Sequence, residues 1–111
     1  MVQERNPCVY ILASQPRGTL YIGVTSNLEG RLWQHREEAM RGFTTRHHIK
    51  RLVWFEMQGD MLTAIAREKQ LKNWHRPWKV NLIEAGNPHW ADLAVGLGFA
   101  PLPLRVRKDG P

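Results

Sequence analysis

The alternation of hydrophobic and polar positions begins with two strand-like runs. Residues 8–14 (CVYILAS) and 19–25 (TLYIGVT) are rich in β-branched and aromatic side chains, and the tetrapeptide QPRG between them is typical of a turn. The two runs are therefore predicted to form a β-hairpin. If the turn sets the pairing, Tyr10 faces Gly23 and Leu12 faces Tyr21, so both tyrosines share one face. Because Gly23 has no side chain, we expect room for a ligand across from Tyr10.

Capping residues and helical spacing organise the middle of the chain. A helix is expected over residues 28–41, after the capping pair Ser26-Asn27 and before Gly42. A third strand is expected over residues 50–58 (KRLVWFEMQ), which again combine β-branched and aromatic side chains.

Two further helices are expected over residues 61–74 and 78–85, the second with Pro77 in its first turn. The buried side of the first is predicted to carry Leu62, Ile65, Ala66 and Leu71. The order β-β-α-β-α-α indicates an α+β fold, in which a small three-stranded antiparallel sheet is flanked by helices.

The composition changes at Gly96, where the chain becomes rich in Gly, Pro and basic residues (GLGFAPLPLRVRKDGP). This stretch has no helical or strand periodicity and is expected to be a mobile tail. Residues 1–95 are therefore predicted to form one domain, and residues 96–111 the tail.

Charge narrows the classes of partner. Sixteen Lys and Arg against ten Asp and Glu give a net charge of +6, which favours an anionic partner, with nucleic acid ahead of an acidic membrane surface. A basic surface that serves solubility alone explains the charge equally well. Cys8 is the only cysteine, so an internal disulfide and a thiolate zinc cluster are excluded. With a polar start to the chain and no apolar run near ~20 residues, we expect a cytoplasmic protein.

The chemistry is predicted to gather around the hairpin and the helix that follows it. Arg31 and His35 are four residues apart and share one side of that helix. Together with Tyr10 and Tyr21, they bring two phenols, a guanidinium and an imidazole within reach of one another. Each of the four has an ordinary structural explanation when taken singly, so their order and spacing carry the interpretation.

That order resembles the GIY-YIG endonuclease superfamily. The resemblance rests on Cys8-Val9-Tyr10, on Tyr21-Ile22-Gly23, on Asn27-Leu28 leading to Arg31 and His35, and on Glu68. Within the superfamily the chain is most similar to a compact, free-standing bacterial group, related to the nuclease domain of an excinuclease subunit, through REKQLK (67–72) and NPHWADL (87–93). Cys8 stands where the first motif usually has Gly, and Asn81 only approximates the position of an asparagine that many members carry after the Glu.

The resemblance implies a metal-dependent DNA endonuclease. It assigns Glu68 to one Mg²⁺ or Mn²⁺ ion, Tyr21 to deprotonation of the attacking water, and Arg31 to charge stabilisation at the phosphate. Tyr10 and His35 would orient the phosphate or water, or relay protons. No small organic cofactor is implied, and a protein partner remains open.

Contacts to the nucleic-acid backbone are expected from basic residues outside this set, although a solvated charged face explains each of them individually. These candidates are Arg46, Lys50, Arg51, Lys69 and Lys72. Five tryptophans are many for this length, and exposed ones could stack unpaired bases, while core packing accounts for most. With no appended DNA-reading motif, a single-stranded, flapped or damaged DNA substrate is favoured, and the pathway stays undecided.

Other kinds of functional site have weaker support in the sequence. The five histidines lack zinc-ligand spacing, the serines lack a nucleophile elbow, the glycines do not form a phosphate loop, and Cys8 is better explained as a buried strand residue. The alternatives in other functional classes are a catalytically weak or inactive nucleic-acid-binding module on the same scaffold, and a basic adaptor for a protein.

Overall fold

The order of elements predicted from the sequence is present in the computed structural model, which describes residues 6–37 and 48–102. Along these residues the chain forms β1 (Cys8–Ala13), β2 (Leu20–Thr25), α1 (Leu28–Arg36), β3 (Arg51–Met57), α3 (Met61–Asn73), α4 (Arg76–Gly86) and a 3₁₀ helix, η1 (Leu93–Leu97). The α+β architecture and the three-stranded antiparallel sheet are therefore confirmed.

The hairpin has the register that the turn length predicts. Tyr10 of β1 faces Gly23 of β2, and Leu12 faces Tyr21. The N–H of the residue after β1, Ser14, donates to a carbonyl across the turn at 3.0 Å. The two tyrosines consequently lie on the same face of the sheet.

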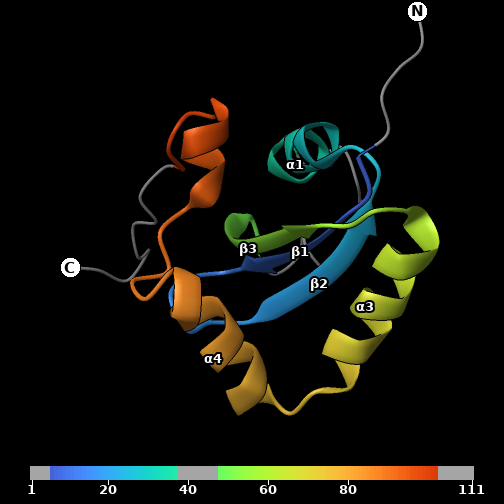
Figure 1. The fold of residues 1–111 in the computed structure, drawn as a ribbon. Coiled ribbons are helices and arrows are strands. Elements are labelled where there is room, and N and C mark those ends of the chain that lie inside the picture. Colours follow the sequence, from blue (N-terminus) through green and yellow to red (C-terminus); the bar gives the residue numbers. More distant parts are fainter. Residues whose placement is uncertain (1–5, 38–47, 103–111) are drawn as a thin grey trace, which may run out of the picture.

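The central strand is β1, because the sheet order is β2-β1-β3 and both pairings are antiparallel (Figure 1). All six residues of β1 are buried, as expected for a strand with neighbours on both sides and helices on both faces. The pairing with β3 shifts between Ile11 and Leu12, a β-bulge that puts one extra residue into β3.

Helices cover both faces of the sheet, and each face has its own hydrophobic core. Val9 and Ile11 of β1 pack with residues of α3 and α4, whereas Cys8, Tyr10 and Leu12 pack with residues of α1 and η1. This alternation follows from the two-residue period of a strand. Figure 1 shows α1 and η1 on one side of the sheet, and α3 and α4 on the other.

The buried side of α3 differs from the prediction. Ala64 and Leu71 are fully buried, whereas Leu62 is 82% exposed and Ala66 is also exposed. Leu62 and Ala66 lie on the solvent-facing side of the helix, whereas the sheet contacts the opposite stripe, on which Ala64, Glu68 and Leu71 recur at helical spacing. The prediction was confirmed for Leu71 and wrong for Leu62 and Ala66, because the apolar residues of this helix do not form one unambiguous face.

The ends of two helices also differ from the predicted ones. Helix α1 ends at Arg36 rather than near residue 41, and α4 begins at Arg76, one residue before Pro77. The expected start of the tail, Gly96, falls inside η1, and Phe99 beyond it packs against the core on the α1 side. The division into a domain and a mobile tail therefore stays a prediction. Among the described helices, none combines the length and apolar character needed to span a membrane.

Candidate active site

Tyr10 crosses the sheet surface above Gly23. A Cβ atom at position 23 would lie 2.5 Å from Cζ and Oη of Tyr10, so the ring occupies the space that any side chain there would need. Tyr10 is 1% exposed. The expectation of ligand space over Gly23 is therefore wrong, because the phenol itself fills that space. The glycine instead lets the Tyr10 hydroxyl reach β2.

Two further rings surround this hydroxyl. The Tyr21 ring centroid lies 6.3 Å from that of Tyr10 and 5.6 Å from that of His35. The Tyr10 hydroxyl lies 3.2 Å from Nε2 of His35. The structure thus brings these three predicted residues together. Tyr10 and His35 are buried, whereas Tyr21 is partly exposed.

Helix α1 delivers the imidazole and the guanidinium. The Asn27 side chain caps the helix by accepting the Gly30 N–H at 3.1 Å. Leu28 and Leu32 then anchor one stripe of α1 in the core, which sets the rotation of the helix and turns His35 toward Tyr10. Arg31 is partly buried, and its charge acts on both Tyr10 and His35.

The buried pair is electrically neutral near pH 7. Burial raises the pKa of Tyr10, the neighbouring Tyr21 adds to the increase, and the Arg31 charge opposes it. Burial, and then the Arg31 charge, lowers the pKa of His35 from its usual 6.5. A protonated phenol can donate or accept, and a neutral imidazole has one donor and one acceptor nitrogen, so the tautomer of His35 sets the direction of its hydrogen bond with Tyr10.

Glu68 lies on α3, which covers the face of the sheet opposite α1. It lies on the stripe of α3 that faces the sheet, and α3 packs against β1 and β2. Its side chain is 16% exposed and pairs with Lys72 Nζ at 3.3 Å. Its charge contributes to the raised pKa of Tyr10, which places the carboxylate within electrostatic range of that phenol.

Glu68 offers a carboxylate oxygen, which is a ligand that a hard divalent cation such as Mg²⁺ prefers. No group of three or more His, Cys, Asp or Glu residues is placed to hold a metal within the part of the chain that the structure describes. A Mg²⁺ ion keeps several waters and binds through one or two carboxylates, so a single Glu suffices.

The predicted backbone-contact residues separate into two groups. Lys69 and Lys72 are exposed on α3, the helix that carries Glu68. Lys50 and Arg51 lie at the start of β3, at the opposite edge of the sheet from β2. Lys50 Nζ donates to the Arg36 carbonyl at 3.4 Å, and Arg51 Nη1 donates to the Trp90 carbonyl at 3.3 Å. Arg46 lies outside the described residues.

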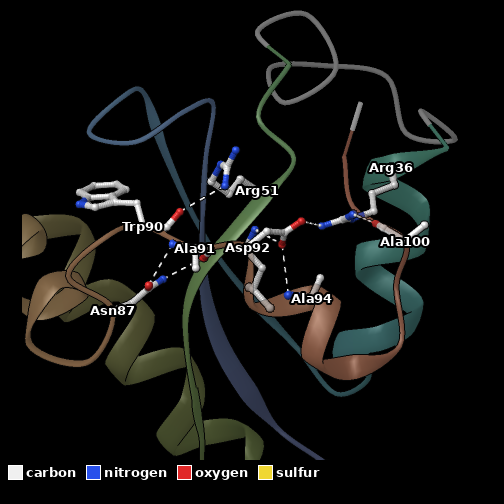
Figure 2. A network of polar contacts seen from close by, with 9 residues as sticks. Arg36, Arg51, Asn87, Trp90, Ala91, Asp92, Ala94 and Ala100 are labelled. Atoms are coloured by element: carbon white, nitrogen blue, oxygen red, sulfur yellow. Dashed lines mark hydrogen bonds and ion pairs between the residues drawn. The ribbon is translucent and has the colours of Figure 1, made fainter. Parts of the chain in front are cut away.

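A buried ion pair that the sequence analysis did not identify positions α1. Arg36 Nη2 lies 2.6 Å from Asp92 Oδ2, and the two side chains are only 10% and 9% exposed (Figure 2). Asp92 Oδ1 also accepts the N–H groups of Leu52 and Ala94, at 3.3 and 3.1 Å. Asp92 thus joins α1, β3 and η1, and so fixes the helix that carries Arg31. The NPHWADL motif contained it, but gave no sign of its partner.

Asn87, another asparagine that follows Glu68 in the chain, is held by hydrogen bonds in the same region. Asn87 Nδ2 donates to the carbonyls of Val53 and Ala91, and its Oδ1 accepts the Ala91 N–H. Figure 2 shows this side chain turned into the backbone turn that follows α4. Its amide is therefore used structurally. Asn81 is exposed on α4.

Comparison with known proteins finds a matching family model and a relative of similar sequence. A family model described as the GIY-YIG catalytic domain matches residues 6–81. The UPF0213 protein of Syntrophus aciditrophicus (strain SB) is 35% identical over 77 residues, which span 68% of this chain and 87% of that protein. No solved structure matches the chain. The region matched by the family model contains Tyr10, Tyr21, Arg31, His35 and Glu68.

Proposed function

This chain belongs to the GIY-YIG catalytic domain family, and from that premise we propose that it is a metal-dependent endonuclease of DNA, with Glu68 as the metal ligand. Family membership makes it a phosphodiester-hydrolysing endonuclease. The ion, the DNA substrate and the roles of individual residues are the proposal. The observation that carries it is the cluster of Tyr10, Tyr21 and His35, with the charges of Arg31 and Glu68 both acting on Tyr10.

Tyr21 is the proposed general base. Of the two phenols, it is the one that substrate can reach, because Tyr10 is buried beneath it. The raised pKa of Tyr10 keeps its proton in place, so Tyr10 cannot serve as the base near neutral pH. Tyr10 and its neutral partner His35 are positioning residues, which hold the Tyr21 hydroxyl at the site.

Arg31 is the proposed phosphate ligand. A guanidinium presents two parallel N–H donors to two phosphate oxygens, and it keeps its charge at any physiological pH. Its electrostatic effect on Tyr10 and His35 places it beside both. It therefore stabilises negative charge that develops on the phosphate during cleavage.

Glu68 would hold one Mg²⁺ or Mn²⁺ ion. A bound divalent ion supplies positive charge that stabilises the transition state of phosphodiester hydrolysis. Glu68 is suited to this because its carboxylate is only partly exposed and is oriented by Lys72 at 3.3 Å. The exposed Lys69 and Lys72 would contact phosphates on either side of the cleaved bond.

Cleavage of single-stranded, branched and duplex oligonucleotides with Mg²⁺, with Mn²⁺ and with EDTA tests the proposal. We expect cleavage only with a divalent ion, and faster cleavage of unpaired or branched strands. Glu68→Ala should abolish cleavage while binding persists, and Glu29→Ala, which removes an exposed carboxylate from α1, is the matched control. A Glu68→Ala protein that cuts at the parental rate across a metal titration would remove Glu68 from the mechanism. A folded parent that binds DNA without cutting it would favour a binding module.

A further inference from the structure

The corner between α3 and α4 carries an exposed aromatic pocket, lined by Trp74, Trp78, Asn81 and Leu82. The rings of Trp74 and Trp78 are 5.9 Å apart and nearly perpendicular, at 82°. Trp78 is 56% exposed. The two rings therefore form adjacent walls of an open corner, in which a planar group can stack on one ring and abut the other.

One of the two walls is fixed in place. The Arg67 guanidinium lies over the Trp74 ring, 5.5 Å from its centroid. Arg67 in turn pairs with Glu56 at 3.0 Å and donates to Gln70 at 2.6 Å. Trp74 is thus held between its own helix and the sheet, so the pocket is preorganised and Trp78 is its accessible surface.

The surroundings of the pocket are strongly basic. Residues 67–79 contain five Lys or Arg and one Glu. Lys79 Nζ donates to the Lys72 carbonyl at 3.4 Å, and Lys72 pairs with Glu68. Cations thus extend from the pocket to the proposed metal ligand. Trp74 follows Glu68 by six residues, about 9 Å along a helix at 1.5 Å per residue.

The other highly exposed tryptophan lacks these surroundings. Trp33 on α1 is also 56% exposed and lines a hollow with Arg31, but Glu29 and Glu37 lie four residues before and after it on the same helical side. Carboxylates on both sides disfavour an anionic strand. The two tryptophans thus have equal exposure but different electrostatic settings, since only Trp33 has carboxylates on both sides.

We propose that the pocket binds an unpaired nucleobase of a single-stranded nucleic acid. The base stacks on Trp78, the Asn81 amide meets its hydrogen-bonding edge, and Lys72 and Lys79 contact the flanking phosphates. The positive charge around the pocket favours a nucleic acid over an apolar protein segment, because an apolar segment would gain nothing from the cations. The inference rests on the proposed nuclease function, for which it supplies a reason to prefer unpaired strands.

Equilibrium binding to a fluorescent oligothymidine in EDTA tests the pocket without cleavage. Trp78→Ala should weaken binding by roughly 5- to 150-fold, the effect of losing one stacked base. Trp78→Phe should retain most of the affinity, and Trp33→Ala should stay within about twofold of the parent, since it removes an equally exposed ring that makes no stack. Thermal unfolding of each variant checks that the fold is kept.

The same binding measurements on an oligonucleotide with abasic residues complete a double-mutant cycle between Trp78 and the base. The parent should bind it more weakly than the intact strand, and Trp78→Ala should cost little further affinity, because the base it would stack is missing. Equal losses on intact and abasic strands, or equal affinities of Trp78→Ala and Trp33→Ala for the intact strand, overturn the proposal. The latter result would leave the pocket to an apolar protein segment. Cleavage by the parent is scored separately, so a protein that binds through Trp78 without cutting defeats the nuclease proposal alone.

Discussion

The ion pair beside α1 and η1 on one face of the sheet is shielded from solvent, whereas the ion pair beside α4 on the other face is exposed. Arg36 and Asp92 form a nearly buried ion pair, but Arg17, which joins the hairpin turn to Glu84 of α4, is 70% exposed. The candidate site lies where these settings meet. The face under α1 holds the neutral pair Tyr10 and His35 together with the partly buried Arg31, and α3 on the other face holds Glu68.

The largest expected effect distinguishes the two phenols at this boundary. Tyr21→Phe should lower the rate of single-turnover cleavage by roughly 10²- to 10⁴-fold, the usual cost of losing a general base, with little effect on DNA binding. Tyr10→Phe removes a hydroxyl that only positions its neighbours, so its loss should be smaller. If the Tyr21→Phe rate stays within about threefold of the parent, well short of general-base loss, Tyr21 is not the base and His35 becomes the next candidate.

The ion pairs of the two faces should differ in their effect on stability. Asp92→Ala leaves Arg36 buried without its partner and should lower the free energy of unfolding by about 3–5 kcal/mol. Arg17→Ala removes an exposed pair and should cost at most about 1 kcal/mol. Chemical denaturation of both variants measures the difference. Equal losses would contradict the distinction between the faces.

The contact between Gly23 and Tyr10 allows a steric test of intermediate size. Gly23→Ala places a methyl group 2.5 Å from the Tyr10 ring, so we expect a loss of about 1–3 kcal/mol in unfolding free energy together with reduced cleavage. Gly59→Ala is the matched control, since no atom lies within 4 Å of its added Cβ, and it should change stability by less than about 0.5 kcal/mol. Wild-type stability and cleavage in Gly23→Ala would show that the Tyr10 ring does not lie over β2.

The smallest expected effect is a pH dependence from His35. Its pKa is lowered in the folded protein, so between pH 6.5 and that lower value the unfolded chain binds more protons than the folded one. The stability contributed by neutral His35 is therefore present above pH 6.5 and lost as the pH falls through the folded pKa. Unfolding free energies from pH 7.5 to 5 should show this decline in the parent, and His35→Gln should flatten it. His75→Gln, at an exposed position, should leave the slope intact.

Local interactions explain why much of the fold was predictable from the sequence. The turn length sets which residues of β1 and β2 face each other, and Asn27 and Asp60 cap the helices that follow them. The ordered motif from Tyr10 to Glu68 likewise indicated the family. Each of these signals depends on neighbours in sequence or on a fixed order along the chain.

Contacts between distant elements decided the rest. Only packing against the sheet selects the stripe of α3 that contains Glu68. Only the pairing of β1 with β2 brings the Tyr10 ring over Gly23, where the ring fills the space. Arg36 and Asp92 are 56 residues apart, so no local pattern pairs them. The neutrality of His35 has the same origin, because burial and the Arg31 charge exist only once α1 is docked. The sequence thus determined which groups are present, and the tertiary structure decided which of them are buried, neutral or charged, because desolvation depends on everything packed around them.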